Sequence, residues 1–126
     1  MSIRSFLSSR DTDDALTFDW NGELIDFSAW EDDAYGHYTY TTRCQRYQFT
    51  FELKPVGREV RIYIVEHPSY GWRSEDPHST HRRHDGRYYI CIEHGLEPTT
   101  TPQALSWAVY WAEQTARYIR TGQAFS

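Results

Sequence analysis

Apolar and polar residues alternate along much of the first half of this chain, with the period of two that is typical of half-buried β-strands. The alternation is clearest from Tyr47 to Leu53 and resumes from Val60 to Ile64, on either side of Pro55-Val-Gly57. The whole segment 37–53 is strand-like. These patterns predict an antiparallel meander, and an Asn21-Gly22 pair between two earlier alternating runs predicts a further hairpin.

The period changes near the C-terminus, where apolar residues recur every three or four positions. This stripe predicts a helix over residues 102–121, with Thr101 as its N-cap, Pro102 in its first turn and Gly122 just beyond its end. Because one face is apolar, we expect the helix to pack across the sheet. The residues of the stripe are Leu105, Ala108, Val109, Ala112, Ala116 and Ile119, and Trp107, Trp111 and Tyr118 widen the apolar face.

The length of 126 residues predicts one domain, and the order of elements predicts the α+β class. We expect a loose N-terminus over residues 1–13 and an antiparallel sheet over 14–66. A long loop follows over 67–101, and the helix completes the domain. A loop of that length inside a compact domain is usually functional or disordered.

Composition narrows the function classes. The net charge is −5, and no window is strongly basic, which argues against binding of nucleic acid through phosphate contacts. We find no signal-peptide pattern and no apolar run long enough to span a membrane, so we expect a cytoplasmic protein with two free thiols. Arginine outnumbers lysine twelve to one, and Lys54 is the only lysine. A GC-rich genome explains this bias. An alternative explanation is that an enzyme that transfers acyl groups to lysines benefits from having few lysines of its own.

The segment from His78 to Cys91, HSTHRRHDGRYYIC, concentrates the groups that could do chemistry. Cys91 ends an apolar strand, where a thiolate could hold an acyl group as a thioester. His81, His84 and His94 could supply an acid, a base or an oxyanion donor. The alternative is that Cys91 is a small buried apolar residue without chemistry.

A metal site is a second interpretation of the same segment. His78, His81 and His84 could bind zinc together with Asp85 or Cys91. Their spacing of three suits one face of a helix, but the Asp85-Gly86 turn interrupts any helix there. On an irregular loop this spacing does not make the ligands converge, so a solvated loop is the commoner outcome.

From about Phe49 to the C-terminus, the order of features resembles the ubiquitin-conjugating enzyme fold, particularly its divergent bacterial relatives. In that family a four-stranded meander precedes a loop in which a His-Pro-Asn element begins ten residues before the catalytic cysteine. Here His81 stands ten residues before Cys91, Gly86 lies between them, and the cysteine lies in Ile90-Cys91-Ile92. Arg82 and Arg83 occupy the positions of the proline and asparagine.

The resemblance implies a transferase that carries a ubiquitin-like modifier as a thioester on Cys91 and passes it to an amine. His81 would order the active-site loop, and His84 or Arg83 would face the developing oxyanion. His94 and Asp85 would lower the pKa of the attacking amine. The reaction would need no metal and no organic cofactor. Its protein partners would be the modifier and an activating enzyme, and in this family such genes often belong to anti-phage defence systems.

Two other functions stay open. The chain could be a non-catalytic binding protein, such as an immunity or anti-defence factor, that meets its partner through an acidic surface and the aromatic residues Tyr35, Tyr70 and Trp72. It could also be a small metal-dependent hydrolase built on the three histidines. The other cysteine, Cys44, lies in a polar run and is interpreted as incidental.

Overall fold

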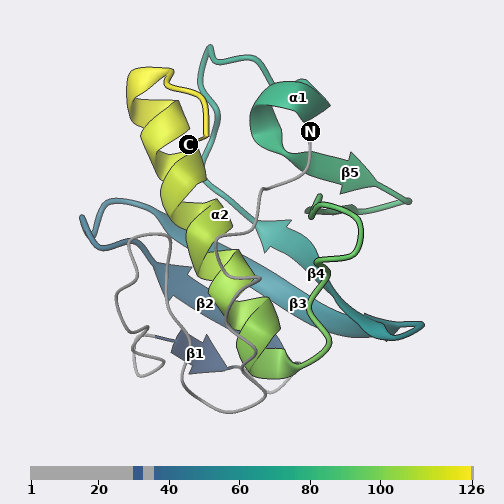
Figure 1. The fold of residues 1–126 in the computed structure, drawn as a ribbon. Coiled ribbons are helices and arrows are strands. Elements are labelled where there is room, and N and C mark those ends of the chain that lie inside the picture. Colours follow the sequence, from purple (N-terminus) through teal and green to yellow (C-terminus); the bar gives the residue numbers. More distant parts are fainter. Residues whose placement is uncertain (1–29, 33–35, 126) are drawn as a thin grey trace.

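The computed structural model describes residues 30–32 and 36–125, which form a six-stranded antiparallel sheet and two helices (Figure 1). The strand order is β1-β2-β3-β4-β6-β5. The strands are β1 (Trp30–Asp32), β2 (His37–Thr41), β3 (Gln48–Val56), β4 (Glu59–Glu66), β5 (Arg82–His84) and β6 (Tyr88–Ile90), and the helices are α1 (Pro77–Thr80) and α2 (Thr101–Thr121). The α+β class predicted from the sequence is confirmed.

The meander from β2 to β4 forms where the alternation predicts it. Its two longest strands, β3 and β4, pair from Val56↔Glu59 back to Thr50↔Glu66, with one register shift between Thr50 and Phe51. The turn between them contains Gly57 at a φ of +63°, a conformation that glycine adopts without steric cost. The sequence predicted that the first strand ends before Pro55, but β3 continues through Pro55 to Val56.

Helix α2 lies across one face of the sheet (Figure 1). The rings of Phe49 and Phe51 on β3 meet the Trp111 ring edge-on, with centroids 5.7 and 6.0 Å apart. All three side chains are fully buried. Such edge-to-face contacts add about 0.5–1.5 kcal/mol each beyond the burial of area. The predicted packing of the helix on the sheet is therefore confirmed.

The ends of α2 agree with the sequence signals to within one residue. Thr100, not Thr101, is the N-cap, and its side chain accepts a hydrogen bond from the amide of Gln103 at 3.3 Å. Thr101 is the first helical residue. At the other end Gly122 has a φ of +79°, and its amide donates to the carbonyl oxygen of Tyr118 at 2.8 Å.

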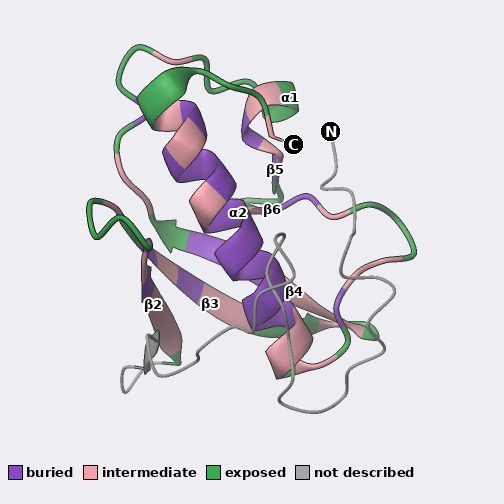
Figure 2. Cartoon of the chain, turned by 60° about the vertical axis from the view of Figure 1, so that its left-hand side comes forward, coloured by how far each residue is buried: buried purple, intermediate pink, exposed green. Residues whose placement is uncertain are grey.

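The helix is buried over much more of its surface than the predicted stripe, as Figure 2 shows. The second buried side faces the segment between β4 and β5. There the Trp111 indole N–H donates to the carbonyl oxygen of Thr80 at 3.0 Å, and the Tyr118 hydroxyl donates to that of Ser74 at 2.7 Å. This segment therefore packs on α2, although its composition of Pro, Ser, Gly, Asp and His predicted an irregular loop.

Three further predictions need correction, and three others fall outside the described residues. A turn at residues 42–47, with Gln45 at a φ of 64°, interrupts the strand predicted over 37–53. The segment 67–101, predicted as a long loop, contains α1, β5 and β6. Tyr70, predicted to be exposed, is buried beneath the Arg82 side chain. The hairpin around Asn21-Gly22, the loose N-terminus and Tyr35 lie outside the described residues.

Within residues 30–32 and 36–125, neither helix has both the length and the apolar character that crossing a membrane requires.

Candidate functional site

The candidate site is built on the hairpin of β5 and β6. Its turn contains the Asp85-Gly86 pair, and the amide of Asp85 donates to the carbonyl oxygen of Arg87 at 3.1 Å. Arg82 pairs with Ile90 across the hairpin, and Arg83 pairs with Tyr89. Because side chains alternate between the faces of a strand, Arg83 and Tyr89 lie on one face of the hairpin, and Arg82 and Ile90 lie on the other.

Cys91 directly follows β6, and its amide donates a hydrogen bond to the carbonyl oxygen of His81 at 3.0 Å. This bond extends the hairpin ladder one position beyond the pair of Arg82 and Ile90. The cysteine is buried, with 5% of its surface exposed. The backbone that follows β6 is therefore fixed at the cysteine, and the thiol is withdrawn from the surface.

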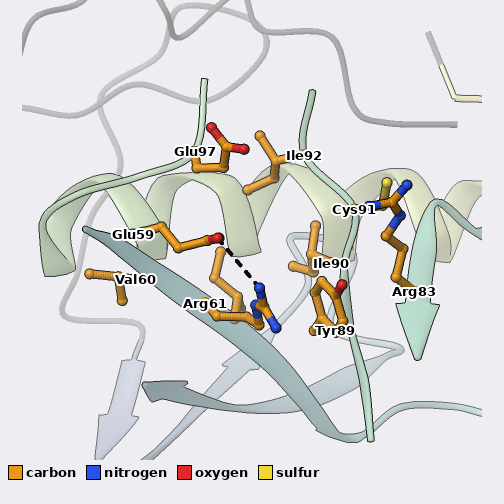
Figure 3. Close-up of a pocket in the computed structure, with 10 residues that line it drawn as sticks. Glu59, Val60, Arg61, Arg83, Tyr89, Ile90, Cys91, Ile92 and Glu97 are labelled. Carbon is orange, nitrogen blue, oxygen red and sulfur yellow. Dashed lines mark hydrogen bonds and ion pairs between the residues drawn. The ribbon is translucent and has the colours of Figure 1, made fainter. Parts of the chain in front are cut away.

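A narrow cavity of about 70 Å³ lies between β4 and the chain that follows β6 (Figure 3). The strands β4 and β6 pair at Tyr63↔Tyr89, and the cavity lies beyond that pair, along Glu59 to Ile62. A volume of this size holds water but no large ligand. The residues that line it are Glu59, Val60, Arg61, Ile62, Arg83, Tyr89, Ile90, Cys91, Ile92 and Glu97.

Among the side chains predicted to act with Cys91, that of Arg83 lies in the same cavity as the thiol. Both side chains line the cavity, and in Figure 3 the Arg83 side chain extends from β5 toward Cys91. They occupy diagonal positions of the hairpin, a separation that a long side chain can span. An arginine beside a thiol is suited to stabilise a thiolate or a developing oxyanion.

His81 takes part through its backbone as well as its ring. It has a φ of 51°, in the left-handed region, where it ends α1 and directs its carbonyl oxygen to the amide of Cys91. Its imidazole packs against the Phe125 ring, with centroids 4.4 Å apart. His81 therefore orders the chain before the hairpin and ties it to the C-terminal tail.

His84 lies on the other face of the hairpin from Arg83. Its ring meets the Tyr88 ring at 4.7 Å, and its Nδ1 accepts a hydrogen bond from the amide of Gly86 at 3.3 Å. It does not line the cavity of Cys91. Of the two residues predicted to face an oxyanion, Arg83 lines the cavity of Cys91 and His84 does not.

Asp85 is engaged away from the thiol. Its carboxylate accepts hydrogen bonds from the Tyr63 hydroxyl at 2.8 Å and from Arg61 at 2.9 Å. The bond from Tyr63, followed by that from Arg61, lowers the pKa of this carboxyl group. An ionised carboxylate held by two donors supports the outer face of the sheet and is not available as a base at Cys91.

His94 is fully exposed, and its Nδ1 lies 3.5 Å from a carboxylate oxygen of Glu97. Glu97 itself lines the cavity, as does Glu59, which is paired with Arg61 at 3.4 Å. The sequence reasoning missed both glutamates. Glu97 follows a glycine turn and precedes Pro98, whose carbonyl oxygen accepts a hydrogen bond from the amide of Val60 at 2.8 Å, and no sequence pattern signals that approach to β4.

The three histidines with spacing of three occupy different elements. His78 lies on α1, His81 at its end and His84 on β5. In the part of the chain that the structure describes, no three side chains of His, Cys, Asp and Glu come together as a group that could hold a metal ion.

Comparisons with family models, with curated proteins and with solved structures found no match to this chain in any of the three.

Proposed function

We propose that this protein is a ubiquitin-conjugating-like acyl carrier that holds a ubiquitin-like modifier as a thioester on Cys91 and transfers it to an amine. The observation that carries the proposal is the position of Cys91. It follows the β5–β6 hairpin, its amide is bonded to the carbonyl oxygen of His81 at 3.0 Å, and it shares a cavity with the Arg83 side chain. The partners are the modifier and an activating enzyme, and the site uses no metal or organic cofactor.

The arrangement of the elements supports this proposal. A meander leads through β4 into a loop, a short hairpin presents the cysteine, and a helix then lies across the sheet. The order agrees with the resemblance found in the sequence. Arg83 at the position of the family's asparagine adds a charged donor on the face of the hairpin that carries Cys91.

The reaction has two steps. The Cys91 thiolate attacks the carbonyl carbon of an activated thioester, the bond to the donor thiol breaks, and the donor leaves as a thiolate. An amine then attacks the new thioester, loses a proton, and displaces Cys91 as a thiolate. The guanidinium of Arg83 faces the oxyanion of each step. The carboxylate of Glu97, which lines the same cavity, accepts the proton of the amine.

Cys91 is 5% exposed, so a substrate cannot reach its sulfur from the surface as it stands. The route to the sulfur is the cavity between β4 and residues 91–97, which Cys91 lines. A modifier's C-terminus is extended, and an extended chain fits a space between two backbone segments better than a bulky side chain does. The reaction therefore requires the chain beyond Cys91, residues 92–97, which forms no helix and bridges to a neighbour at one position only, to move away from β4.

A trapping experiment tests the proposal. The chain is co-expressed with the genes that neighbour its own, and Cys91→Ser replaces the thioester by an oxyester. We expect an adduct that survives reductant and is removed by mild alkali. If an activating enzyme and a modifier are present and no Cys91-dependent adduct forms, the transferase proposal is wrong.

One observation favours a second function, that of a non-catalytic binding protein. The Trp72 side chain is 84% exposed, and the guanidinium of Arg73 lies 4.2 Å from the centre of its ring. Tryptophan is enriched among binding hot spots, and this one is exposed. If Trp72→Ala abolishes association with a partner while Cys91→Ala leaves it unchanged, the binding function replaces the transferase.

A further inference from the structure

A second site lies on the opposite face of the hairpin, at the side chain of Arg82. Its guanidinium carbon lies 3.9 Å from the centre of the Tyr88 ring and 5.0 Å from that of the Tyr70 ring. Arg82 is 4% exposed, although arginine is rarely buried to this extent. The fold therefore holds a positive charge inside a shell of aromatic rings.

This buried charge is only partly paired. The Nη2 atom donates to a carboxylate oxygen of Glu75 at 3.1 Å, while the Nε atom has no hydrogen-bond partner in the described part of the chain. In a guanidinium the N–H groups of Nε and Nη2 point to the same side and together match the two oxygens of one carboxylate or phosphate. Glu75 therefore accepts a hydrogen bond from Nη2 only, and the N–H group of Nε on this two-donor edge, or fork, stays without an acceptor among the described residues.

Leaving a buried charged donor unpaired is unfavourable, because its hydration is lost without a replacement. Glu75 is a weak partner for such a group. Its side chain is 57% exposed and makes this one bond with Arg82. A solvent-exposed carboxylate of this kind can be displaced by an oxyanion that engages both donors.

An open groove gives such an oxyanion room. It has a volume of about 510 Å³, which lies within the range of small-molecule sites. Glu75 is its one acidic member among the described residues, although the whole chain has a net charge of −5. Besides Arg82 and Glu75, the groove is lined by Pro77, Thr80, Arg83, His84, Tyr88 and Tyr89.

We propose that this groove binds the oxyanion, a carboxylate or a phosphate, of a small organic ligand, which takes both N–H groups on the Nε–Nη2 edge of Arg82 in place of Glu75. The groove supplies aromatic walls for the organic part, and Arg83 and His84 add positive charge or donors at its rim. Glu75 occupies the site until the ligand arrives. The inference rests on Arg82 and does not require the chemistry at Cys91, although the side chain of Arg83 lines both the groove and the cavity of Cys91.

The test is a titration of the full-length chain with sodium acetate and with inorganic phosphate, followed by the backbone amide signals of β5 and β6 in NMR. Sodium chloride is the control for ionic strength. We expect saturable shifts with at least one oxyanion, and the oxyanion that binds more tightly identifies the ligand class. Shifts that grow linearly, or equally with chloride, would overturn the proposal.

Three variants make the test specific. Arg82→Lys keeps the charge but loses the fork, so binding should weaken about tenfold, the equivalent of one charge-assisted hydrogen bond. Glu75→Gln removes the competing carboxylate and should tighten binding several-fold. Arg58→Gln removes an exposed arginine that does not line the groove and should leave binding unchanged.

If Arg82→Lys does not fold, Glu75→Gln decides the question alone, because Glu75 is exposed and the glutamine amide oxygen can still accept a hydrogen bond from Arg82. Unchanged affinity in Glu75→Gln, or unchanged affinity in a folded Arg82→Lys variant, would show that the oxyanion does not bind at Arg82.

Discussion

The amide of Cys91 donates a hydrogen bond to the carbonyl oxygen of His81 at 3.0 Å, so the two residues that the sequence separates by ten positions are joined through their backbones. His81 accomplishes this in the left-handed conformation, at a φ of 51°. The conformation turns the chain from α1 into β5. The position of Cys91 thus depends on the backbone conformation of His81.

A matched pair of substitutions at His81 tests this dependence. Asparagine tolerates the left-handed region, whereas a β-branched residue does not. Both His81→Asn and His81→Val lose the ring contact with Phe125, so the difference between them isolates the backbone strain. We expect His81→Val to be less stable than His81→Asn by about 1–2 kcal/mol in urea unfolding. Equal stabilities would show that the backbone conformation is not required.

The hydrogen bond from Trp111 to Thr80 ties α2 to the segment before the hairpin. Trp111→Phe removes the indole N–H, leaves the Thr80 carbonyl oxygen without this donor and opens a small cavity in the core. We expect a loss of about 2–4 kcal/mol in the free energy of unfolding. The control is Trp72→Phe, at an exposed position, which should stay within about 0.5 kcal/mol of the wild type. Similar losses in both variants would contradict the assigned role of Trp111.

Asp76 makes the stability of the loop before the hairpin dependent on pH. Hydrogen bonds from Ser74 and then from Ser79 lower the pKa of its carboxyl group from 3.8 to about 2. A lowered pKa means that the ionised form stabilises the fold above pH 4, and that this contribution is lost as the pH falls toward 2. The stability difference between wild type and Asp76→Ala should therefore shrink over this interval. A difference that stays constant with pH would contradict the assignment.

Arg83 should affect the rate at which the Cys91 adduct forms. If its guanidinium stabilises the oxyanion, Arg83→Gln should slow the reaction about a hundredfold, as expected for the loss of one oxyanion donor. Arg46→Gln, which removes an exposed arginine in the turn between β2 and β3, is the control. The measurement is the time course of adduct formation with purified partners. An unchanged rate in Arg83→Gln would show that Arg83 does not stabilise the oxyanion.

The sequence predicted the strands and the helix whose residues follow one clear period of apolar and polar positions. The alternation around Phe49 and Phe51 produced β3, and the apolar stripe with Pro102 and Gly122 produced α2. These signals are local, and tertiary packing reinforces them. The sequence predicted that Trp111 and Tyr118 widen the apolar face of α2, but it did not predict that the polar segment with Ser74 and Thr80 covers them.

The elements near the site were harder to predict. Strand β5 has no apolar alternation, because Arg82 is buried between aromatic rings rather than among aliphatic side chains. Helix α1 does carry a signal that was not used, since Asp76 caps it and Pro77 occupies its first position. The glutamates of the cavity, Glu59 and Glu97, depend on contacts between distant segments, which no local pattern reports.

The most direct test of the account is the intact mass of the chain purified from cells that also express its neighbouring genes, measured with and without thiol reductant. We predict an adduct that reductant removes, that is absent in Cys91→Ala and that persists in Cys44→Ala. Cys44 is an exposed thiol in the turn at residues 42–47, so it controls for nonspecific reactivity. An adduct lost in Cys44→Ala and retained in Cys91→Ala, or an unmodified chain beside a functional activating enzyme, would contradict the account.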